Sequence, residues 1–275
     1  MTLNTRNKLL LLFSIFSSLC SLIFIIALVR ILIQNPQKAD FVFDVPAVRS
    51  LWYIPVISNY PAVFFSRLFL SVFVPVIGFA IYFNFEKTQS LEVLFFSAFL
   101  IGFLGETFTL CIPLFGLTAG YSTILRFIGQ TAFFGEMEIV LAIIILAIIT
   151  SSSENRDTDK YLGLIIVTSL IFSTIVPLNT SLIKNHMHID FGLKHLLSTI
   201  RIIFGSAAFF ALFLSPKSKE SADYKKASFN FLFICCGYIL LLECINFAFL
   251  IIGAILLSGG AIRFLKNMHR YYMWK

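Results

Sequence analysis

Charged residues are scarce in this sequence. Asp, Glu, Lys and Arg together make up 13% of its 275 residues, about half the share that is usual in soluble domains. Hydrophobic residues make up 59% of the chain, with 33 phenylalanines among them. A soluble globule of this composition could not cover its surface with polar groups. The chain is therefore expected to use lipid as its solvent, and the lipid bilayer is its first predicted partner.

Acidic residues are scarcer than basic ones, and the formal net charge is +7. In a membrane protein, this balance reflects loops that face anionic lipid headgroups. The sequence has no soluble segment in which basic residues alternate with aromatic ones. No nucleic-acid partner is therefore predicted.

The sequence also lacks the motifs of common catalytic and nucleotide-binding sites. It has no Gly-rich phosphate loop, no GxSxG elbow and no HExxH pair. It has no CxxC either, and its five cysteines all fall inside apolar runs, where they are expected to pack as small apolar side chains. These absences favour a protein without a cofactor and without catalysis of its own. They leave open a membrane-embedded enzyme that modifies a lipid.

Seven long apolar runs stand out along the chain. Each reaches about the 20 residues that a helix needs to cross a hydrocarbon core of ~30 Å. Because lipid offers the backbone no hydrogen-bond partners, such runs must be helices. We predict an all-α, polytopic transmembrane bundle of seven helices, forming one integral membrane domain over residues 1–275. The runs are Leu9–Ile33, Ala62–Phe83, Leu91–Leu114, Ser122–Thr150, Leu162–Ile183, His195–Leu214 and Ser228–Ala261.

The last run is too long for one perpendicular crossing, at ~50 Å. Either it tilts or protrudes, or it contains an eighth, short segment after Asn246. The count of basic loop residues favours a cytoplasmic N-terminus in a bacterial inner membrane. With seven helices, however, the basic, aromatic tail at residues 262–275 would lie outside. An eighth segment would reconcile both ends.

The longest connection, Gln34–Pro61, contains four prolines and the aromatic pair Trp52–Tyr53. Aromatic residues of this kind are typical of the membrane interface. The connection is too short to be a separate domain. We expect it to form a cap over one end of the bundle.

Charges inside the apolar runs are the main functional signal. On insertion scales, an unpaired charge within the hydrocarbon costs about 2.5–3.5 kcal/mol. Counted along the helices, the three arginines and Glu106 fall in one half of the membrane, and the other acids lie near the middle. Arg67 and Arg126 are shallow enough to extend to the interface. The seven residues are Arg67, Glu106, Arg126, Glu136, Glu138, Arg201 and Glu243.

Two interpretations of these charges stay open. They could form a structural ion-pair network, or they could line a polar cavity whose arginines bind an anionic group. In either case we expect the three arginines to approach a common region with Glu106 and at least one of the two acids at 136 and 138. Glu136 and Glu138 are ~200° apart around a helix and cannot both face one site.

A second cluster, His186, His188 and Asp190, lies between the fifth and sixth runs. The HxHxD spacing places three metal-ligand side chains on one side of an extended strand. These residue types make metal binding chemically possible there, but the HxHxD spacing is not specific to metal sites.

The stretch Phe85–Phe108, "FEKTQSLEVLFFSAFLIGFLGETF", resembles a region of uncharacterised seven-helix bacterial integral membrane proteins. Those are similar to the membrane sensor regions of bacterial signalling proteins. The resemblance covers about a tenth of the chain. No kinase or cyclase domain of the kind usual downstream in that family is expected from this sequence, and no functional residue carries over.

Together these features favour a non-catalytic module that senses a ligand or binds a partner. The Arg/Glu cluster would recognise a small anionic ligand, and a membrane or cytoplasmic protein would receive the signal. A small proton-coupled transporter is the alternative, in which Glu136, Glu138 or Glu243 would exchange protons.

Overall fold

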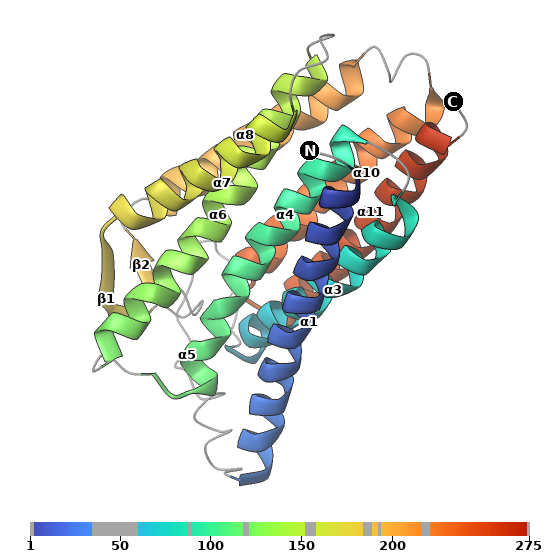
Figure 1. Ribbon diagram of the computed structural model, residues 1–275. Helices are drawn as coiled ribbons and strands as arrows, with labels where there is room; N and C mark the ends of the chain where they lie inside the picture. Colours follow the sequence, from blue (N-terminus) through green and yellow to red (C-terminus); the bar gives the residue numbers. More distant parts are fainter. Residues whose placement is uncertain are drawn as a thin grey trace.

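The computed structural model describes residues 3–34, 60–86, 90–117, 121–151, 158–183, 189–191, 194–215 and 221–273. Eight long helices within these ranges pack side by side into one bundle (Figure 1). They are α1 (Leu3–Gln34), α3 (Tyr60–Asn84), α4 (Leu91–Thr107), α6 (Ser122–Ser151), α7 (Thr158–Ile175), α8 (Lys194–Leu214), α10 (Ala222–Leu242) and α11 (Phe247–Met273). The predicted cap over residues 34–61 falls almost entirely outside the described residues.

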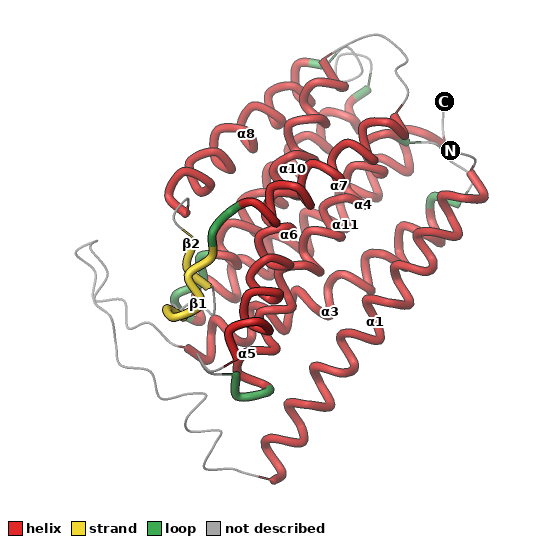
Figure 2. The backbone as a smooth tube through the Cα atoms, turned by 60° about the vertical axis from the view of Figure 1, so that its left-hand side comes forward, coloured by secondary structure: helices red, strands yellow, loops and turns green. Residues whose placement is uncertain are grey.

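Short elements lie at one end of this bundle. A 3-10 turn, η1 (Phe108–Leu110), and the short helix α5 (Cys111–Leu114) follow α4. Strands β1 (Leu178–Ile183) and β2 (Ile189–Phe191) pair antiparallel between α7 and α8. Figure 2 shows this hairpin and α5 toward the end of the bundle away from the two termini.

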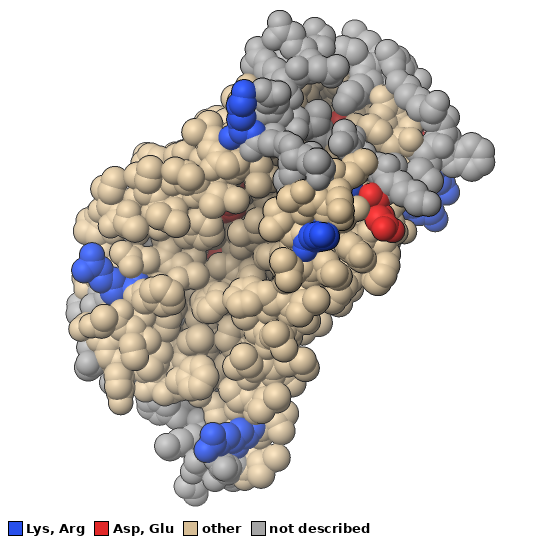
Figure 3. Space-filling model, viewed as in Figure 1, with Lys and Arg blue, Asp and Glu red and all other residues tan. Residues whose placement is uncertain are grey.

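The prediction of an all-α polytopic membrane bundle is confirmed. Seven helices are long and apolar enough to cross a membrane, whereas the apolar part of α7, Lys160–Ile175, is shorter. Large apolar side chains such as Ile26, Ile175 and Leu214 are exposed on the outside of the bundle. On the face drawn in Figure 3, the protruding charged side chains lie toward the ends of the molecule, and the outer surface between them is uncharged apart from acidic atoms deep in a hollow. This is the surface expected of an integral membrane protein in lipid.

Two predicted runs have different boundaries in the structure. The run Leu162–Ile183 is not one helix, because α7 ends at Ile175 and the chain continues into β1. Pro177 explains the break: it has no N–H to donate, and it disfavours helical backbone in the residue before it. It therefore ends this helix instead of kinking it.

The run Ser228–Ala261 is divided into α10 and α11. Asn246 starts the second helix, since its side-chain oxygen accepts a hydrogen bond from the backbone N–H of Phe249 at 2.9 Å. This is an N-cap, which satisfies one of the free N–H groups at a helix start. The eighth segment after Asn246 is therefore present, and it is a full-length helix. Glu243 lies in the connection, not in the middle of a span.

Eight helices return the chain to the end at which it began. Figure 1 shows the N- and C-termini at the same end of the bundle. Residues 262–273, predicted as part of a tail, form the last turns of α11. The connections at this end carry most of the loop lysines and arginines. With eight helices, the N-terminus and the basic C-terminal residues therefore lie on the same side of the membrane.

Accessibility labelling checks this topology. With the five native cysteines replaced, single cysteines at Ser152, at Ser218 and at the C-terminal Lys275 should all react from the side of the N-terminus. The reason is that α7, although short, returns the chain across the bundle. Reaction of Lys275→Cys from the side opposite to Ser152→Cys would contradict the eight-helix topology.

Glycines set how closely the central helices approach. Lipid gives helices no hydrophobic reason to associate, so small residues that allow close packing are favoured at their contacts. A Cβ atom on Gly135 of α6 would lie 2.3 Å from the carbonyl oxygen of Gly102 on α4. On α10, a Cβ atom on Gly237 would lie 2.5 Å from the backbone nitrogen of Leu257 on α11. Both helix pairs therefore cross with their backbones in contact.

The substitution Gly135→Ala tests the α4–α6 crossing. We expect it to lower the free energy of unfolding by about 1–3 kcal/mol, because the new methyl group collides with backbone and not with a flexible side chain. Gly163→Ala on α7 is the matched control, since a Cβ there meets no atom within 4 Å. The alanine at 163 should be neutral or stabilising by up to about 1 kcal/mol. Equal stability of both variants in a detergent unfolding titration would argue against the close crossing.

Candidate functional site

The α4–α6 crossing brings together two Gly–Glu dipeptides, Gly105–Glu106 and Gly135–Glu136. A Cβ atom on Gly105 would lie 3.0 Å from the Cα of Gly135, and one on Gly135 would lie 3.1 Å from the backbone nitrogen of Glu106. The side chains of Glu106 and Glu136 are 0% and 2% exposed. Two carboxylates are thus held near one crossing point in the interior of the bundle, where each needs a compensating charge.

Glu106 is compensated from two other helices. Arg67 on α3 forms an ion pair with it, with 2.5 Å between Nη1 and Oε2, and neither side chain is exposed. The hydroxyl of Tyr238 on α10 donates a hydrogen bond to the other carboxylate oxygen. The Arg67 guanidinium also donates to the carbonyl of Leu242 at 3.3 Å. Arg67 therefore joins α3 to α4 and to the end of α10, and it does not extend to the interface.

Glu136 is compensated by α8. Arg201 forms an ion pair with it, and both side chains are almost fully buried. The charge of Arg201 also interacts with Tyr238, Glu106 and Glu243. The two pairs and the tyrosine therefore act as one electrostatic unit, called here the ion-pair cluster. Its members are Arg67, Glu106, Glu136, Arg201 and Tyr238.

The other predicted residues lie apart from these direct pairs. Glu138 is fully buried on a different side of α6. Glu243 is half-buried in the α10–α11 connection and reaches Arg201 only through its charge. Arg126 is exposed near the start of α6 and makes no ion pair with any described residue. The structure thus separates Arg126 from the arginines with which the sequence grouped it.

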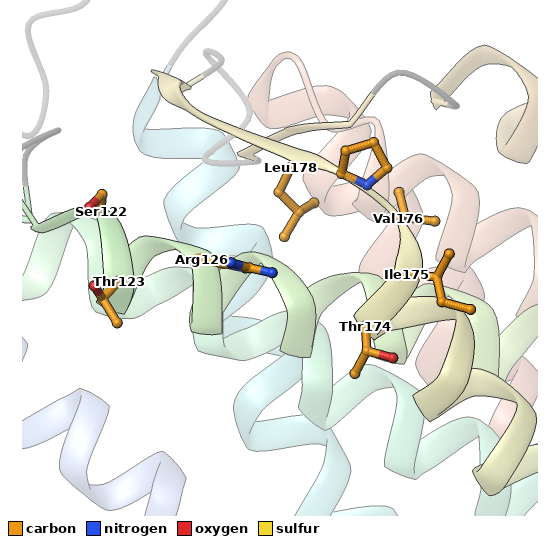
Figure 4. Close-up of a pocket in the computed structure, with 8 residues that line it drawn as sticks. Ser122, Thr123, Arg126, Thr174, Ile175, Val176 and Leu178 are labelled. Carbon is orange, nitrogen blue, oxygen red and sulfur yellow. The ribbon is translucent and has the colours of Figure 1, made fainter.

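A hollow of about 580 Å³ opens beside Arg126. Figure 4 shows the guanidinium lying between the first turns of α6 and the segment that joins α7 to β1. Hydroxyl groups come from both sides of the hollow, and apolar side chains form the rest of its wall. The lining residues are Ser122, Thr123, Arg126, Thr174, Ile175, Val176, Pro177 and Leu178.

The β1–β2 hairpin holds this hollow in place against α6. Leu178 and Ile189 pack on Gly129, where an added Cβ would meet their side chains at 3.0 Å and 3.1 Å. Asp190, one of the three candidate metal ligands, lies in β2 opposite Asn179. His186 and His188 fall outside the described residues. Within the described ranges, no group of three His, Cys, Asp or Glu side chains could hold a metal ion.

A further buried acid, Glu92, lies in the first turn of α4. It is 0% exposed and accepts hydrogen bonds from the hydroxyls of Tyr224 at 2.9 Å and Tyr272 at 2.6 Å. These contacts tie α4 to α10 and α11 near the end that holds the termini. Neither tyrosine has a sequence signal, because a Tyr in an apolar run resembles any other core aromatic.

Comparison with known protein families, with curated proteins and with solved structures finds no match to this chain. The function must therefore be argued from the geometry of these sites.

The energetic role of the ion-pair cluster can be tested with a double-mutant cycle. Arg67→Met and Glu106→Gln should each destabilise the protein by about 3–5 kcal/mol, because each leaves an opposite charge buried without its partner. The double variant should be more stable than the sum of the two losses by about 0.5–3 kcal/mol. Unfolding in detergent, followed by circular dichroism, measures all four proteins.

The exposed pair of Asp223 and Lys226 on α10 provides the control. Its charged atoms are 3.9 Å apart and both side chains are solvent-accessible, so Lys226→Met should cost less than about 1 kcal/mol. Strict additivity of Arg67→Met and Glu106→Gln would mean that the pair is not coupled.

Proposed function

We propose that this chain is a non-catalytic membrane module that binds a small anionic group in the hollow beside Arg126. The binding event would be sensed by the helices that form the hollow. The proposal rests on the contrast in ion pairing between Arg126 and the two other arginines. The two other arginines of the membrane half are neutralised by buried carboxylates, whereas this one faces a hollow with no ion-pair partner among the described residues.

The lining of the hollow suits a phosphate or carboxylate group. A guanidinium offers several N–H donors in a planar fork that matches such anions. The hydroxyls of Ser122 and Thr123 supply further donors, whereas the Thr174 hydroxyl donates to the carbonyl of Ile171 and can offer a ligand only its oxygen. The apolar wall, including Ile175 and Leu178, suits a ligand with an apolar portion. A lipid headgroup and a free small anion share this chemistry.

The same lining supports binding and not catalysis. General acid–base catalysis needs a carboxylate, histidine or other titratable group within hydrogen-bond reach of the reacting atoms. None of the eight lining residues is a carboxylate, histidine or cysteine. The hydroxyls have no base beside them in the lining set to activate them as nucleophiles.

The position of the hollow offers a way to transmit binding. A ligand that contacts Arg126 and Thr174 at once would bridge α6 and α7. Its binding energy would favour one spacing of these helices over another. Because α6 also carries Glu136, a shift in α6 would reach the ion-pair cluster. A membrane or cytoplasmic protein could read this change, as the resemblance of residues 85–108 to bacterial sensor regions suggests.

The location that fits best is a bacterial inner membrane with both termini in the cytoplasm. The connections on the side of the termini are rich in lysine and arginine, and such loops remain cytoplasmic. The hollow and the hairpin would then face the outside.

Binding of an anion should depend on Arg126. We expect inorganic phosphate or short-chain phosphatidylglycerol to stabilise the detergent-purified protein against thermal unfolding. The gain would be about 2.7 kcal/mol at a ligand concentration 100 times its dissociation constant. In Arg126→Gln the gain should fall by at least half, because the guanidinium supplies the charge.

Arg263→Gln is the matched control, because Arg263 is exposed on α11 away from the hollow. This variant should respond as the unaltered protein does. A response to phosphate alone would indicate a free anion, and a response to the lipid alone would indicate a headgroup. Equal responses of the Arg126 and Arg263 variants would overturn the proposal.

A further inference from the structure

Glu138 is the one described acid of the bundle interior whose carboxylate oxygens both lack a hydrogen-bond partner. Its side chain is 0% exposed, and neither Oε1 nor Oε2 is bonded to a described residue. Glu106 and Glu136, by contrast, are each paired with an arginine. Glu138 lies near the middle of α6, ~24 Å from Ser122 along the helix axis. At this depth the side chain is shielded from bulk water and from the lipid headgroups.

Ser169 on α7 faces this carboxyl group. Its hydroxyl group interacts with the Glu138 carboxyl group. The two groups do not, however, form a hydrogen bond of normal geometry. The Ser169 hydroxyl is itself fully buried and unbonded. The neighbouring Ser173 and Thr174 instead donate to carbonyls of their own helix, each at 2.8 Å. Two unsatisfied polar groups are thus opposed across the α6–α7 contact.

Among the described side chains of the surrounding helices, none forms an ion pair with Glu138. Glu106 on α4 and Glu136 on α6 belong to the ion-pair cluster, and Arg201 is paired with Glu136 there. Glu92 is bonded to two tyrosines. Lys160, in the first turn of α7, lies ~14 Å from Ser169 along the helix axis, and Arg126 lies ~18 Å from Glu138 along α6. The titratable side chains described on α4, α6, α7 and α8 are Glu92, Glu106, Arg126, Glu136, Glu138, Lys160, Tyr161 and Arg201.

An ionised carboxylate is poorly suited to these surroundings. Moving an isolated charge into a medium of low dielectric constant is so costly that such groups usually neutralise instead. A carboxylic acid carries no net charge, and it has one O–H donor and a carbonyl acceptor. A single hydroxyl such as that of Ser169 can accept from the first or donate to the second. The neutral acid can therefore form a hydrogen bond with Ser169, its polar partner among the described residues.

We propose that Glu138 and Ser169 form a proton-binding site between α6 and α7. The carboxylate takes up one proton to give the neutral acid when the two helices are in contact. It releases that proton when they separate and water enters. This inference goes beyond anion binding at the hollow and rests on different residues.

The place of α7 in the bundle makes such a separation feasible. Its main contact is with α6, and it meets α4 at only a few positions. Its opposite face carries exposed apolar side chains, including Leu164, Val167 and Leu170, that suit lipid. Moving α7 away from α6 would therefore disturb few other contacts. Proton occupancy and the α6–α7 contact would be linked, and each would favour the other.

Infrared spectroscopy of the protein in lipid tests this site directly. At neutral pH the unaltered protein should show the carbonyl stretch of a protonated carboxylic acid, shifted by exchange into D2O. Glu138→Gln should lose this band completely, because the amide has no acidic proton and is similar in size. Ser169→Ala should keep the band but shift its frequency, since the hydrogen-bond partner is removed.

Ser173→Ala is the matched control, because that hydroxyl lies on the same helix and donates to the carbonyl of Leu170. Its spectrum should equal that of the unaltered protein. If Glu138→Gln does not fold, the comparison of the two serine variants still decides, and identical spectra would refute the site. A band of full intensity in Glu138→Gln, or no such band in the unaltered protein, would also overturn the proposal. Anion binding at Arg126 would be unaffected by that failure.

Discussion

The backbone contact between α4 and α6 is the constraint on which the interior of this protein depends. Glycines at the crossing let the two helices touch, and two of them, Gly105 and Gly135, are each followed by a glutamate. The crossing therefore fixes two carboxylates at one depth, far from bulk water. Neither could be tolerated alone, so arginines from α3 and α8 must pack beside them. One close contact between two helices thus determines the position of two more.

These buried charges determine which helices pack against one another, which apolar contacts in lipid cannot do. Apolar faces are interchangeable in a bilayer, because lipid tails solvate any of them equally well. A buried arginine is different, since it must meet its own carboxylate. Arg67 further requires α10, because it donates to the carbonyl of Leu242, and Tyr238 of the same helix donates to Glu106. Glu92 sets the neighbours at the other end in the same way, through Tyr224 and Tyr272.

The sequence predicts the helices well because length and apolar content are local properties. Pro177 and Asn246 mark the two boundaries that hydropathy alone misplaces, and both act through the backbone of their own segment. The partners of the charges are harder to predict. Depth along a helix places Arg67 and Arg126 alike, but it does not say which way either side chain points. Only the packing shows that one is buried against Glu106 and the other is exposed. The repeated Gly–Glu dipeptide was the available signal for the crossing.

The paired and the unpaired charges of α6 lie on different sides of the helix and hold it with different strength. Glu136 is held by Arg201, and a pair of this kind resists change because separating it exposes two charges to lipid. Arg126 and Glu138 have no such partner in the part of the chain that the structure describes, and both lie where α6 meets α7 or the segment that follows it. One side of the helix is therefore fixed to the core by charge, and another meets its neighbour through weak polar contacts. Under the proposed function, a ligand in the hollow would act first on the weakly held contact between α6 and α7, and only a shift of α6 itself would reach the ion-pair cluster.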